Sequence, residues 1–396
     1  MQIYLDITRL YRRLLDNKRP TGVDRVSLAY IAHYGDNARA VLSESGFYIV
    51  LSHRDSANAF KSLLTQTRPK PGHLGLTIAR TLARLPFVQH PAAGILLHTA
   101  HSGVESARYF RSLREHGIRV VFMVHDLIPL THAEYARAET PAVHARRIDT
   151  ALKHASGIIA NSHATRVSLE NYAAHTAQST PPVATAQLAP AIIDRGEVAP
   201  PPIHSPYFLM LGTIEPRKNH WLMLHVWRRL VEQHGTRAPK LVIVGRRGWE
   251  CENVIDMLER CAELRNVVIE KGDCSDTELY GLLKHARALL FPSFAEGYGM
   301  PLAEALALNV PVLASDLPVF REIAGDIPDY LDPLDGPAWL KRIQSYAMLP
   351  SHERDTQLAR IPAFRESTWA QHFETVDAFL RKLDRIAHPA RDDRYC

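Results

Sequence analysis

The stretch FPSFAEGYGMPLAEALALNVPVLASDLPVFREIAGD, residues 291–326, indicates how this chain folds. It opens on the end of an apolar strand and continues into a turn rich in glycine. Pro301 follows at a position where the first turn of a helix tolerates proline. That helix is predicted to run to about Leu308, and Val310–Ala314 is predicted to form a short buried strand. The order strand, turn, helix, strand places helical N–H groups and the positive end of a helix dipole beside the turn.

Two carboxylates bracket this turn, Glu296 in the loop and Glu304 in the predicted first turn of the helix. Their spacing lets both point into one crevice at the carboxyl end of the strand. Carboxylates accept hydrogen bonds from hydroxyl groups, which suits sugar and ribose oxygens. Glu304 also has a purely structural interpretation, because acidic residues at a helix start contribute about 0.3–1 kcal/mol. Gly297 and Gly299 favour ligand binding, because glycine lets the backbone approach a ligand closely.

A second glycine turn follows the predicted strand Tyr207–Leu211. Gly212 permits close approach of the backbone, and Arg217 and Lys218 meet the start of the next helix. Cations at a helix N-terminus oppose its dipole, so their placement costs stability and indicates function. Two cations and a helix start together suit a diphosphate, and the alternative is a pair of solvated loop charges.

The segment around the Glu296 turn resembles the signature of retaining glycosyltransferase family 4, in the form F-P-S-x-x-E-G-Y-G-M-P-L-A-E-A-L. The second glycine turn, G-T-x-E-P-R-K-N, is similar to the donor-phosphate turn of that family. The resemblance implies the α/β GT-B fold, in which two Rossmann-like domains with parallel sheets face each other across a cleft. It also implies a C-terminal helix that crosses back to the N-terminal domain. It is strong from Tyr207 to Pro333 and weak between Arg54 and Pro91.

The resemblance implies roles for individual residues. Catalysis is expected to depend on Glu296, His125, Arg217 and Lys218. A larger set is expected to bind the donor: Gly212, Arg217, Lys218, Lys271, Gly297, Tyr298, Gly299, Met300 and Glu304. Contacts with the acceptor or the cleft are expected from Gly22, Asp126 and Ser162.

Three of these residues in the first half can also be read from their local sequence. His125 follows the apolar segment Arg119–Val124, which is typical of a buried parallel strand, and ligands bind at the carboxyl edge of such sheets. A histidine that only satisfies backbone groups is the alternative. Gly22 and Ser162 also stand at predicted helix starts, where small polar segments cap helices for structural reasons.

The domains are predicted to be residues 1–200, which bind the acceptor, and 201–370, which bind the nucleotide sugar. Residues 371–396 hold the returning helix and the tail. The proline-rich segment 194–206 is predicted to link the domains. A helix is predicted from about 132 to 154, interrupted at Pro141. A basic amphipathic helix over 74–88 fits either the core or a membrane surface.

The composition limits the class of protein. The 396 residues carry a net charge of +5, and no run of eighteen apolar residues predicts a membrane span. Basic residues gather near the start, at Arg9, Arg12, Arg13, Lys18, Arg19 and Arg25. They suit anionic lipid, a nucleotide or a polyanionic acceptor, or they form an ordinary solvated surface. No nucleic-acid-binding motif is present. The four cysteines show no metal-binding spacing, so a reduced cytoplasmic protein is expected, with peripheral membrane contact as a further hypothesis.

The function expected from the sequence is a retaining glycosyltransferase that uses a nucleotide-diphosphate sugar and needs no metal or other cofactor. Metal independence is expected because no strand end carries an Asp-x-Asp loop. The usual setting of similar proteins implies a glycan or lipid-linked acceptor in bacterial surface polysaccharide assembly, with mannose as the first candidate sugar. The alternatives are a nucleotide-sugar 2-epimerase, a sugar phosphorylase and a non-catalytic nucleotide-sugar-binding subunit.

Overall fold

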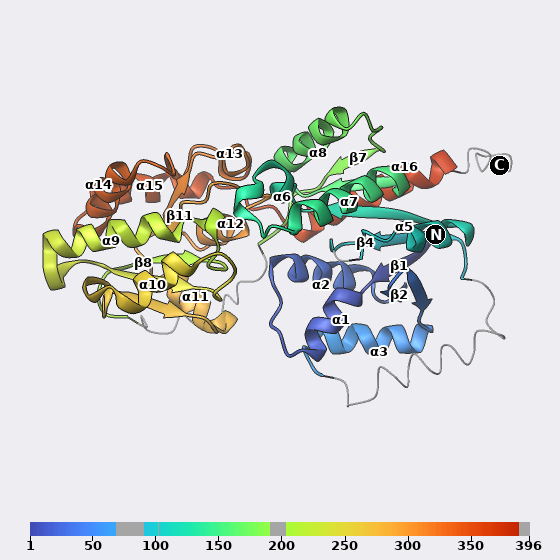
Figure 1. Cartoon of the computed structure of the whole chain (residues 1–396), viewed down its shortest axis with the longest axis horizontal. Coiled ribbons are helices and arrows are strands. Elements are labelled where there is room, and N and C mark those ends of the chain that lie inside the picture. The colour runs from blue at the N-terminus through green and yellow to red at the C-terminus, as the bar shows by residue number, and fades with distance from the viewer. Residues whose placement is uncertain (69–90, 102, 191–202, 388–396) are drawn as a thin grey trace. The chain divides into compact units, whose positions relative to one another are not determined.

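The computed structural model describes residues 1–68, 91–101, 103–190 and 203–387. It divides the chain into two compact units (Figure 1). Unit 1 comprises Met1–Leu127, Ala142–Leu188 and Thr368–Cys396, and unit 2 comprises Ile128–Pro141 and Ala189–Ser367. The chain therefore leaves unit 1 twice and returns to it at the end. The amphipathic helix predicted over 74–88 and most of the predicted linker lie outside the described residues.

Unit 1 is built on a seven-stranded sheet in the order β3-β2-β1-β4-β5-β6-β7. The strands are β1 Gln2–Asp6, β2 Ala38–Glu44, β3 Phe47–Val50, β4 Gly94–His98, β5 Ile118–Val124, β6 Gly157–Ala160 and β7 Val183–Thr185. All neighbours are parallel except β2 and β3, which form an antiparallel hairpin at the edge. The apolar run that predicted a buried parallel strand is confirmed as β5, whose residues are nearly all buried.

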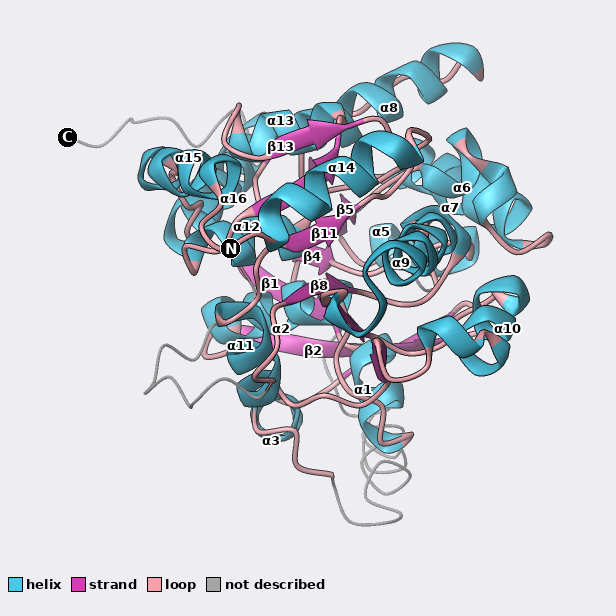
Figure 2. Cartoon of the chain, turned by 90° about the vertical axis from the view of Figure 1, so that its left-hand side faces the viewer, coloured by secondary structure: helices cyan, strands magenta, loops and turns pink. Residues whose placement is uncertain are grey.

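Helices flank the strands of unit 1 (Figure 2). They are α1 Thr8–Leu15, α2 Gly22–Tyr34, α3 His53–Leu64, α5 Ala107–Glu115, α7 Thr140–His154, α8 His163–His175 and α16 Trp369–Ala387. The last of these, α16, comes from the C-terminal end of the chain. Its Phe373 ring stacks on His33 of α2 at 3.9 Å, and Arg119 of β5 donates a 2.7 Å hydrogen bond to the Leu383 carbonyl. The C-terminal helix thus packs against the unit that the N-terminus begins.

Unit 2 is built on a six-stranded sheet in the order β10-β9-β8-β11-β12-β13. Its strands are β8 Tyr207–Leu211, β9 Lys240–Val244, β10 Val268–Lys271, β11 Leu289–Phe291, β12 Val312–Ser315 and β13 Asp329–Leu331, and all neighbours are parallel. Its longer helices are α9 His220–His234, α10 Glu252–Arg260, α11 Asp276–Lys284, α12 Met300–Ala307, α13 Pro318–Ala324, α14 Gly336–Ala347 and α15 His352–Arg360. Parallel strands joined by helices were expected for this half.

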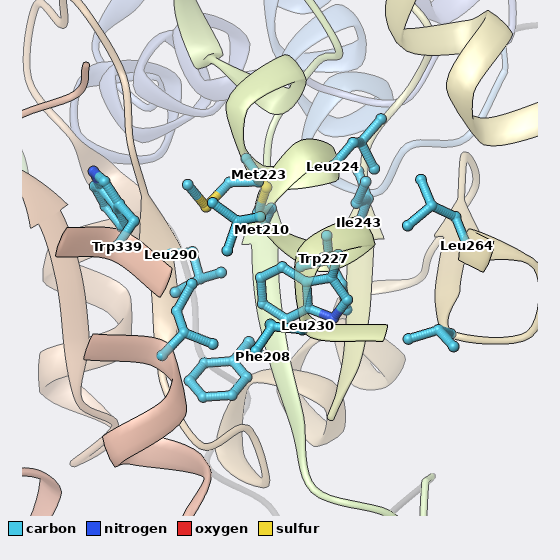
Figure 3. Packing of buried hydrophobic residues seen from close by; sticks show 14 of the residues in the cluster. Phe208, Met210, Met223, Leu224, Trp227, Leu230, Ile243, Leu264, Leu290 and Trp339 are labelled. Carbon is cyan, nitrogen blue, oxygen red and sulfur yellow. The ribbon is translucent and has the colours of Figure 1, made fainter. Parts of the chain in front are cut away.

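A large apolar cluster fixes the strands of unit 2 against α9 (Figure 3). Phe208 of β8 and Trp227 of α9 are fully buried and meet edge to face at 5.8 Å. The Trp227 indole N–H donates a 2.8 Å hydrogen bond to the Pro239 carbonyl, so its one polar atom is satisfied. Truncation of a buried tryptophan of this kind costs about 3–5 kcal/mol. This packing holds the strand ends of unit 2, where its candidate site lies, in fixed positions.

Each sheet has one point at which the strand order reverses. In unit 1 the chain leaves β1 for β2 and β3 and returns on the other side as β4. In unit 2 it leaves β8 for β9 and β10 and returns as β11. Because the two following connections diverge there, a crevice opens beyond the carboxyl ends of these strands, and ligands bind in it. The switch points are therefore β1/β4 and β8/β11.

The helix predicted from 132 to 154 is wrong in its first part. The segment forms a short helix α6, Ile128–Thr131, a 3-10 turn at Ala133–Tyr135, and α7 from Thr140. Pro141 does not interrupt α7 but lies in its first turn, where a missing N–H costs nothing. Residues 128–141 were also assigned to the first domain, whereas the structure places them in unit 2. There Tyr135 stacks on Phe294 at 5.2 Å.

Candidate functional site

The turn after β8 brings two backbones unusually close together at the switch point of unit 2. Gly212 has φ +139°, and a Cβ there would lie 3.3 Å from the Lys218 side chain. A Cβ on Gly245, which follows β9, would lie only 1.8 Å from the Gly212 carbonyl oxygen. Glycine is required at both positions: Gly212 has a positive φ, and Gly245 has no space for a Cβ. The turn is thus a close approach of two strand ends, and the predicted approach of its backbone to a ligand stays a prediction.

Arg217 and Lys218 lie on the 3-10 turn Pro216–Lys218, immediately before α9. The backbone links them to the turn after β11: the Phe294 N–H donates to the Arg217 carbonyl at 2.8 Å. The Arg217 guanidinium returns a bond from Nη1 to the Ala295 carbonyl at 2.9 Å. The two turns of the switch point are therefore joined by hydrogen bonds in both directions.

Glu296 is the centre of an ion-pair network that both cations share. Its Oε2 lies 2.7 Å from Arg217 Nη1, and its Oε1 lies 2.5 Å from Lys218 Nζ. Arg217 Nε also contacts Glu215 Oε1 at 2.7 Å, and the Ser293 hydroxyl donates to Glu296 at 2.8 Å. Two cations and two carboxylates are thus paired in a nearly buried group. We call these four residues, Glu215, Arg217, Lys218 and Glu296, the switch-point quartet.

Burial and charge act in opposite directions on this quartet. Burial alone would raise the pKa of Glu296, but Arg217 and Lys218 stabilise the carboxylate and lower its pKa to about 2. Burial lowers the pKa of Lys218, and its contact with Glu296 opposes that shift without cancelling it. Glu296 touches two cations, so it carries its negative charge at neutral pH. The Lys218 ammonium also lies 4.7 Å from the face of the Phe291 ring, which favours a cation.

The glycine turn before α12 holds the rest of the predicted donor residues. Gly299 has φ +120°, and a Cβ there would lie 2.7 Å from the Phe320 ring, so glycine is required. Tyr298 is buried, Gly297 is partly buried, and Met300 is the first residue of α12. The expectation that Glu304 lies in the first turn of this helix is wrong. Because α12 begins at Met300, Glu304 lies one turn further along, partly buried.

Lys271, the remaining predicted donor residue, ends β10 at the edge of the same sheet. Its ammonium lies 2.6 Å from Glu278 Oε1 on α11, and both side chains are about one-third exposed. Glu278 lies in the first turn of α11, where its N–H donates to the Ser275 hydroxyl at 3.1 Å. The donor-binding role of Lys271 stays a prediction.

In unit 1, His125 follows β5 and is held on three sides. Its backbone N–H donates to His101 Nε2 at 3.1 Å, and its carbonyl accepts from Asn161 Nδ2 at 2.9 Å. Its ring Nε2 lies 2.8 Å from the Thr99 carbonyl. A carbonyl only accepts, so Nε2 carries the ring proton and Nδ1 is the acceptor. Burial lowers the pKa of His125, so the imidazole is neutral.

The other candidates in unit 1 have clear structural roles. Ser162 caps α8, because its hydroxyl accepts from the Thr165 N–H at 3.0 Å. Gly22 begins α2 at ordinary negative φ, so no backbone strain requires glycine there. Asp126 follows His125 and offers its carbonyl to His144 Nε2 at 3.2 Å. These contacts explain why the residues suit their places, and they leave the predicted binding roles as predictions.

The structure therefore gathers Gly212, Arg217, Lys218, Glu296 and the Gly297–Gly299 turn at one switch point of unit 2. It places His125 and Asp126 at the carboxyl edge of the sheet of unit 1. The sequence analysis missed Glu215 as a partner of Arg217, although it stands two residues away on the same turn. It also missed His101 and Thr99, because their contact with His125 depends on β4 lying beside β5.

The comparisons with known proteins agree with this geometry. Residues 198–327, which include the switch point of unit 2, match the family described as glycosyl transferases group 1. The chain carries a glycosyl transferases group 1 domain. This domain contains every predicted donor-binding residue.

The chain is similar to several mannosyltransferases. The serotype-specific mannosyltransferase WbdA of Escherichia coli is 29% identical over 315 residues, which are 74% of this chain and 37% of WbdA. The O-antigen chain mannosyltransferase B of the same species is 36% identical over 129 residues, one-third of each chain. RfbU of Salmonella typhimurium is 32% identical over 147 residues, 36% of this chain and 39% of RfbU. The chain thus spans well under half the length of the relatives that it matches.

Solved structures share the fold over the whole chain. Anabaena HepE in complex with UDP-glucose superposes with a TM-score of 0.65 at 15% identity, over 98% of this chain and 99% of that one. An α,α-trehalose-phosphate synthase from Burkholderia vietnamiensis gives 0.62 at 11% identity, over 98% of each chain. At these identities the likeness is one of fold. The chain has the GT-B fold, with two parallel α/β domains.

Among the residues that the structure describes, no group of three histidine, cysteine, aspartate or glutamate side chains is arranged to hold a metal ion. None of the described helices is long and apolar enough to cross a membrane.

Proposed function

We propose that this protein is a retaining glycosyltransferase that transfers a sugar, with mannose the first candidate, from a nucleotide-diphosphate donor to a glycan or lipid-linked acceptor. The observation that carries the proposal is the switch-point quartet, which lies inside the segment that matches glycosyl transferases group 1. The similarity to O-antigen mannosyltransferases supports the sugar and bacterial surface polysaccharide assembly as the setting.

The difficult step of such a transfer is the departure of a nucleoside diphosphate with developing negative charge. Arg217 and Lys218 would stabilise that charge, and their contacts with Glu215 and Glu296 already fix their orientation. Fixed donors need no reorganisation during the reaction, and the loss of one typically costs about 2.7–4 kcal/mol. The first N–H groups of α12, which begins at Met300, have no acceptor within the helix and can offer further donors.

The acids and the histidine have separate roles in this proposal. Glu296 accepts hydrogen bonds from hydroxyls of the transferred sugar, and Glu304 from the ribose. Lys271 lies beside the nucleobase. His125, with its proton on Nε2, offers Nδ1 as an acceptor for a hydroxyl of the sugar or of the attacking group. The acceptor attacks from the same face as the leaving phosphate, whose oxygen takes the proton, so the anomeric configuration is retained.

The proposal includes metal independence, because Arg217 and Lys218 supply the charge that a divalent cation would otherwise supply. It follows that a chelator leaves transfer unchanged. For its location in the cell, we propose that the protein contacts the cytoplasmic face of an anionic membrane peripherally. The basic residues near the N-terminus support this proposal.

The test is an assay of the purified chain against a panel of nucleotide sugars, with and without mannosylated acceptors, followed by NMR of the product. Transfer from GDP-mannose with retained configuration, insensitive to EDTA, is the expected result. Conversion of the donor without any acceptor would indicate an epimerase. Trapping of a glycosyl adduct on Glu296 would replace same-face attack by a covalent mechanism.

A further inference from the structure

The basic residues near the N-terminus lie at the switch point of unit 1. Helix α1 begins two residues after β1 ends, and it carries Arg9 and Arg13 one turn apart. Helix α2 begins at Gly22 in the same connection, between β1 and β2, and its first turn contains Asp24. This connection leaves β1 at the β1/β4 reversal, where the strand order opens a crevice. Neither helix contributes to the turns that form the switch-point quartet of unit 2.

One buried carboxylate holds both arginines. Asp24 Oδ1 accepts from Arg9 Nε at 2.8 Å, and Asp24 Oδ2 lies 2.8 Å from Arg13 Nε. The Asp24 side chain is 1% exposed, whereas those of Arg9 and Arg13 are 31% and 21% exposed. Asp24 also accepts from the N–H and hydroxyl of Thr21 at 2.7 and 2.6 Å. The carboxylate is thus fully used, and it fixes two guanidinium groups that reach solvent.

The acids near this group are already engaged. Glu44 pairs with Arg12, and Asp16 pairs with Lys18. Asp6 is occupied elsewhere, by the Tyr109 hydroxyl at 2.8 Å and the Ser43 hydroxyl at 3.1 Å. A buried ion pair contributes little net stability, so two arginines sharing one carboxylate are better explained by a ligand than by folding.

The position of the pair connects it to the candidate acceptor side. The order β1-β4-β5 places the end of β1 two strands from His125, about 10 Å at the usual strand spacing. Thr99, whose carbonyl accepts from the His125 ring, also donates its hydroxyl to Ser27 of α2 at 2.8 Å, so α2 packs beside the His125 site. Arginine forks match the oxygens of a phosphate or carboxylate group, and phosphate, with more charge, gains more from two of them.

We propose that Arg9 and Arg13 form a binding site for a phosphate or diphosphate group of the acceptor. The inference rests on the proposed function, since it assigns the anion to the molecule that receives the sugar. The site selects acceptors that carry phosphate near the sugar end. The phosphate can belong to a soluble glycan or to a lipid-linked one, because the arginines recognise the same oxygens in both.

The test uses inorganic pyrophosphate as the probe, measured by isothermal titration calorimetry. The wild-type chain is expected to bind two pyrophosphates, one at Arg9 and Arg13 and one at Arg217 and Lys218. Substitution of Arg9 and Arg13 alone would leave the buried Asp24 carboxylate without a cation and endanger the fold. The variant is therefore Arg9→Gln/Arg13→Gln/Asp24→Asn, which removes the two cations and the acid together. It should weaken one site at least tenfold and leave the other unchanged.

Asp24→Asn alone is the matched control. It disturbs the same capping contacts but keeps both arginines, so pyrophosphate affinity should be equal or higher. If it lowered affinity as far as the triple variant does, the effect would be structural and the proposal would be wrong. Lys218→Ala should lose only the other site. If the triple variant binds pyrophosphate as the wild type does and Lys218→Ala loses one site, this inference is wrong and the proposed donor site stands. If the triple variant loses one site and Lys218→Ala binds as the wild type does, only the proposed donor site is wrong.

A second arm distinguishes the source of the phosphate. Sedimentation with vesicles of phosphatidylglycerol and phosphatidylcholine in equal parts is compared between wild type and the triple variant. Loss of pyrophosphate binding in the triple variant, with or without loss of vesicle binding, supports the site. Loss of vesicle binding with unchanged pyrophosphate binding would show a general membrane surface instead, and would overturn it.

Discussion

The two sheets use the same place for different charge arrangements. At the β8/β11 switch point, Arg217 and Lys218 are paired with Glu215 and Glu296, so two cations meet two acids. At the β1/β4 switch point, Arg9 and Arg13 share Asp24, so two cations meet one acid. The arginines are similarly exposed in the two groups: Arg217 is 22% exposed, and Arg13 and Arg9 are 21% and 31% exposed. The groups differ in their acids, because the first has one acid for each cation and the second has one acid for two cations.

The difference teaches that a topological switch point supplies a position but not a chemistry. In both units the connections diverge beyond parallel strands, and helix starts point their N–H groups at the gap. The side chains on the first turns decide the rest. Glycine at 212 and 299 lets the backbone of unit 2 pass close to the Lys218 side chain and the Phe320 ring. The connection after β1 instead carries α1, whose Arg9 and Arg13 lie one turn apart.

The largest effect is expected from Lys218→Ala, which tests whether the balanced group of unit 2 performs the chemistry. Transfer should fall about 100- to 1,000-fold, because one fixed donor to the leaving phosphate is lost. Initial rates with the nucleotide sugar give the measurement. Lys341→Ala, an exposed lysine of the same unit, is the control and should keep full activity. Full activity in Lys218→Ala with an intact melting curve would refute the role.

Glu296→Gln tests the charge balance of the unit 2 group, because it leaves Arg217 and Lys218 with only one acid, as Arg9 and Arg13 have in unit 1. We expect a loss of about 3 kcal/mol in the free energy of unfolding, as for other buried pairs that lose one partner. Urea unfolding gives the measurement. Asp316→Asn, which removes an exposed partner of Arg321, is the control and should cost much less. An equal effect in both variants would contradict the burial argument.

The pH dependence of stability follows from the same carboxylate. The pKa of Glu296 is lowered from its ordinary value of 4.5 to about 2 in the folded protein. Its contribution is therefore fully present above pH 4.5 and is lost as the pH falls toward 2. The difference between wild type and Glu296→Gln in urea should shrink across that window. A difference that stays constant from pH 6 to pH 3 would show that Glu296 does not have a lowered pKa.

His101→Phe should have a moderate effect, confined to unit 1. The His125 N–H would lose its acceptor, and a buried unsatisfied donor costs about 1–3 kcal/mol. Transfer should fall through a higher KM for the acceptor, while donor affinity, measured by calorimetry, should not change. The exposed His175→Gln is the control. A loss of donor affinity would mean that the two units do not divide donor and acceptor as proposed.

Arg247→Ala should have the smallest effect. Arg247 follows β9, one strand away from the switch point, and its charge is already matched by Glu270 and Glu259. Because its ion pairs are exposed, we expect a loss of no more than about 1 kcal/mol and transfer within twofold of wild type. A large loss of transfer would show that the catalytic charges extend along the sheet edge beyond β8 and β11.

The sequence predicted elements best where one pattern dominates locally. The apolar run before His125 became β5, and the two glycine turns became the close approaches at Gly212 and Gly299. It failed in the first part of the helix predicted over 132–154, because a proline inside a helical pattern is equally compatible with a break and with a new helix start. Packing against Phe294, far away in sequence, places Tyr135 in unit 2, and no local pattern carries that information.

By itself, the sequence located the residues to which the proposed chemistry is assigned: the cations after β8, the acid after β11 and the histidine after β5. Strand ends and glycine turns are local properties, set by side-chain periodicity and allowed backbone angles. Only the tertiary structure decided the partners. Arg217 meets Glu296 across 79 positions of the chain, and Arg9 and Arg13 share Asp24 rather than pairing separately. The physical reason is that charge pairing depends on distance and burial, which strand order fixes and sequence spacing does not.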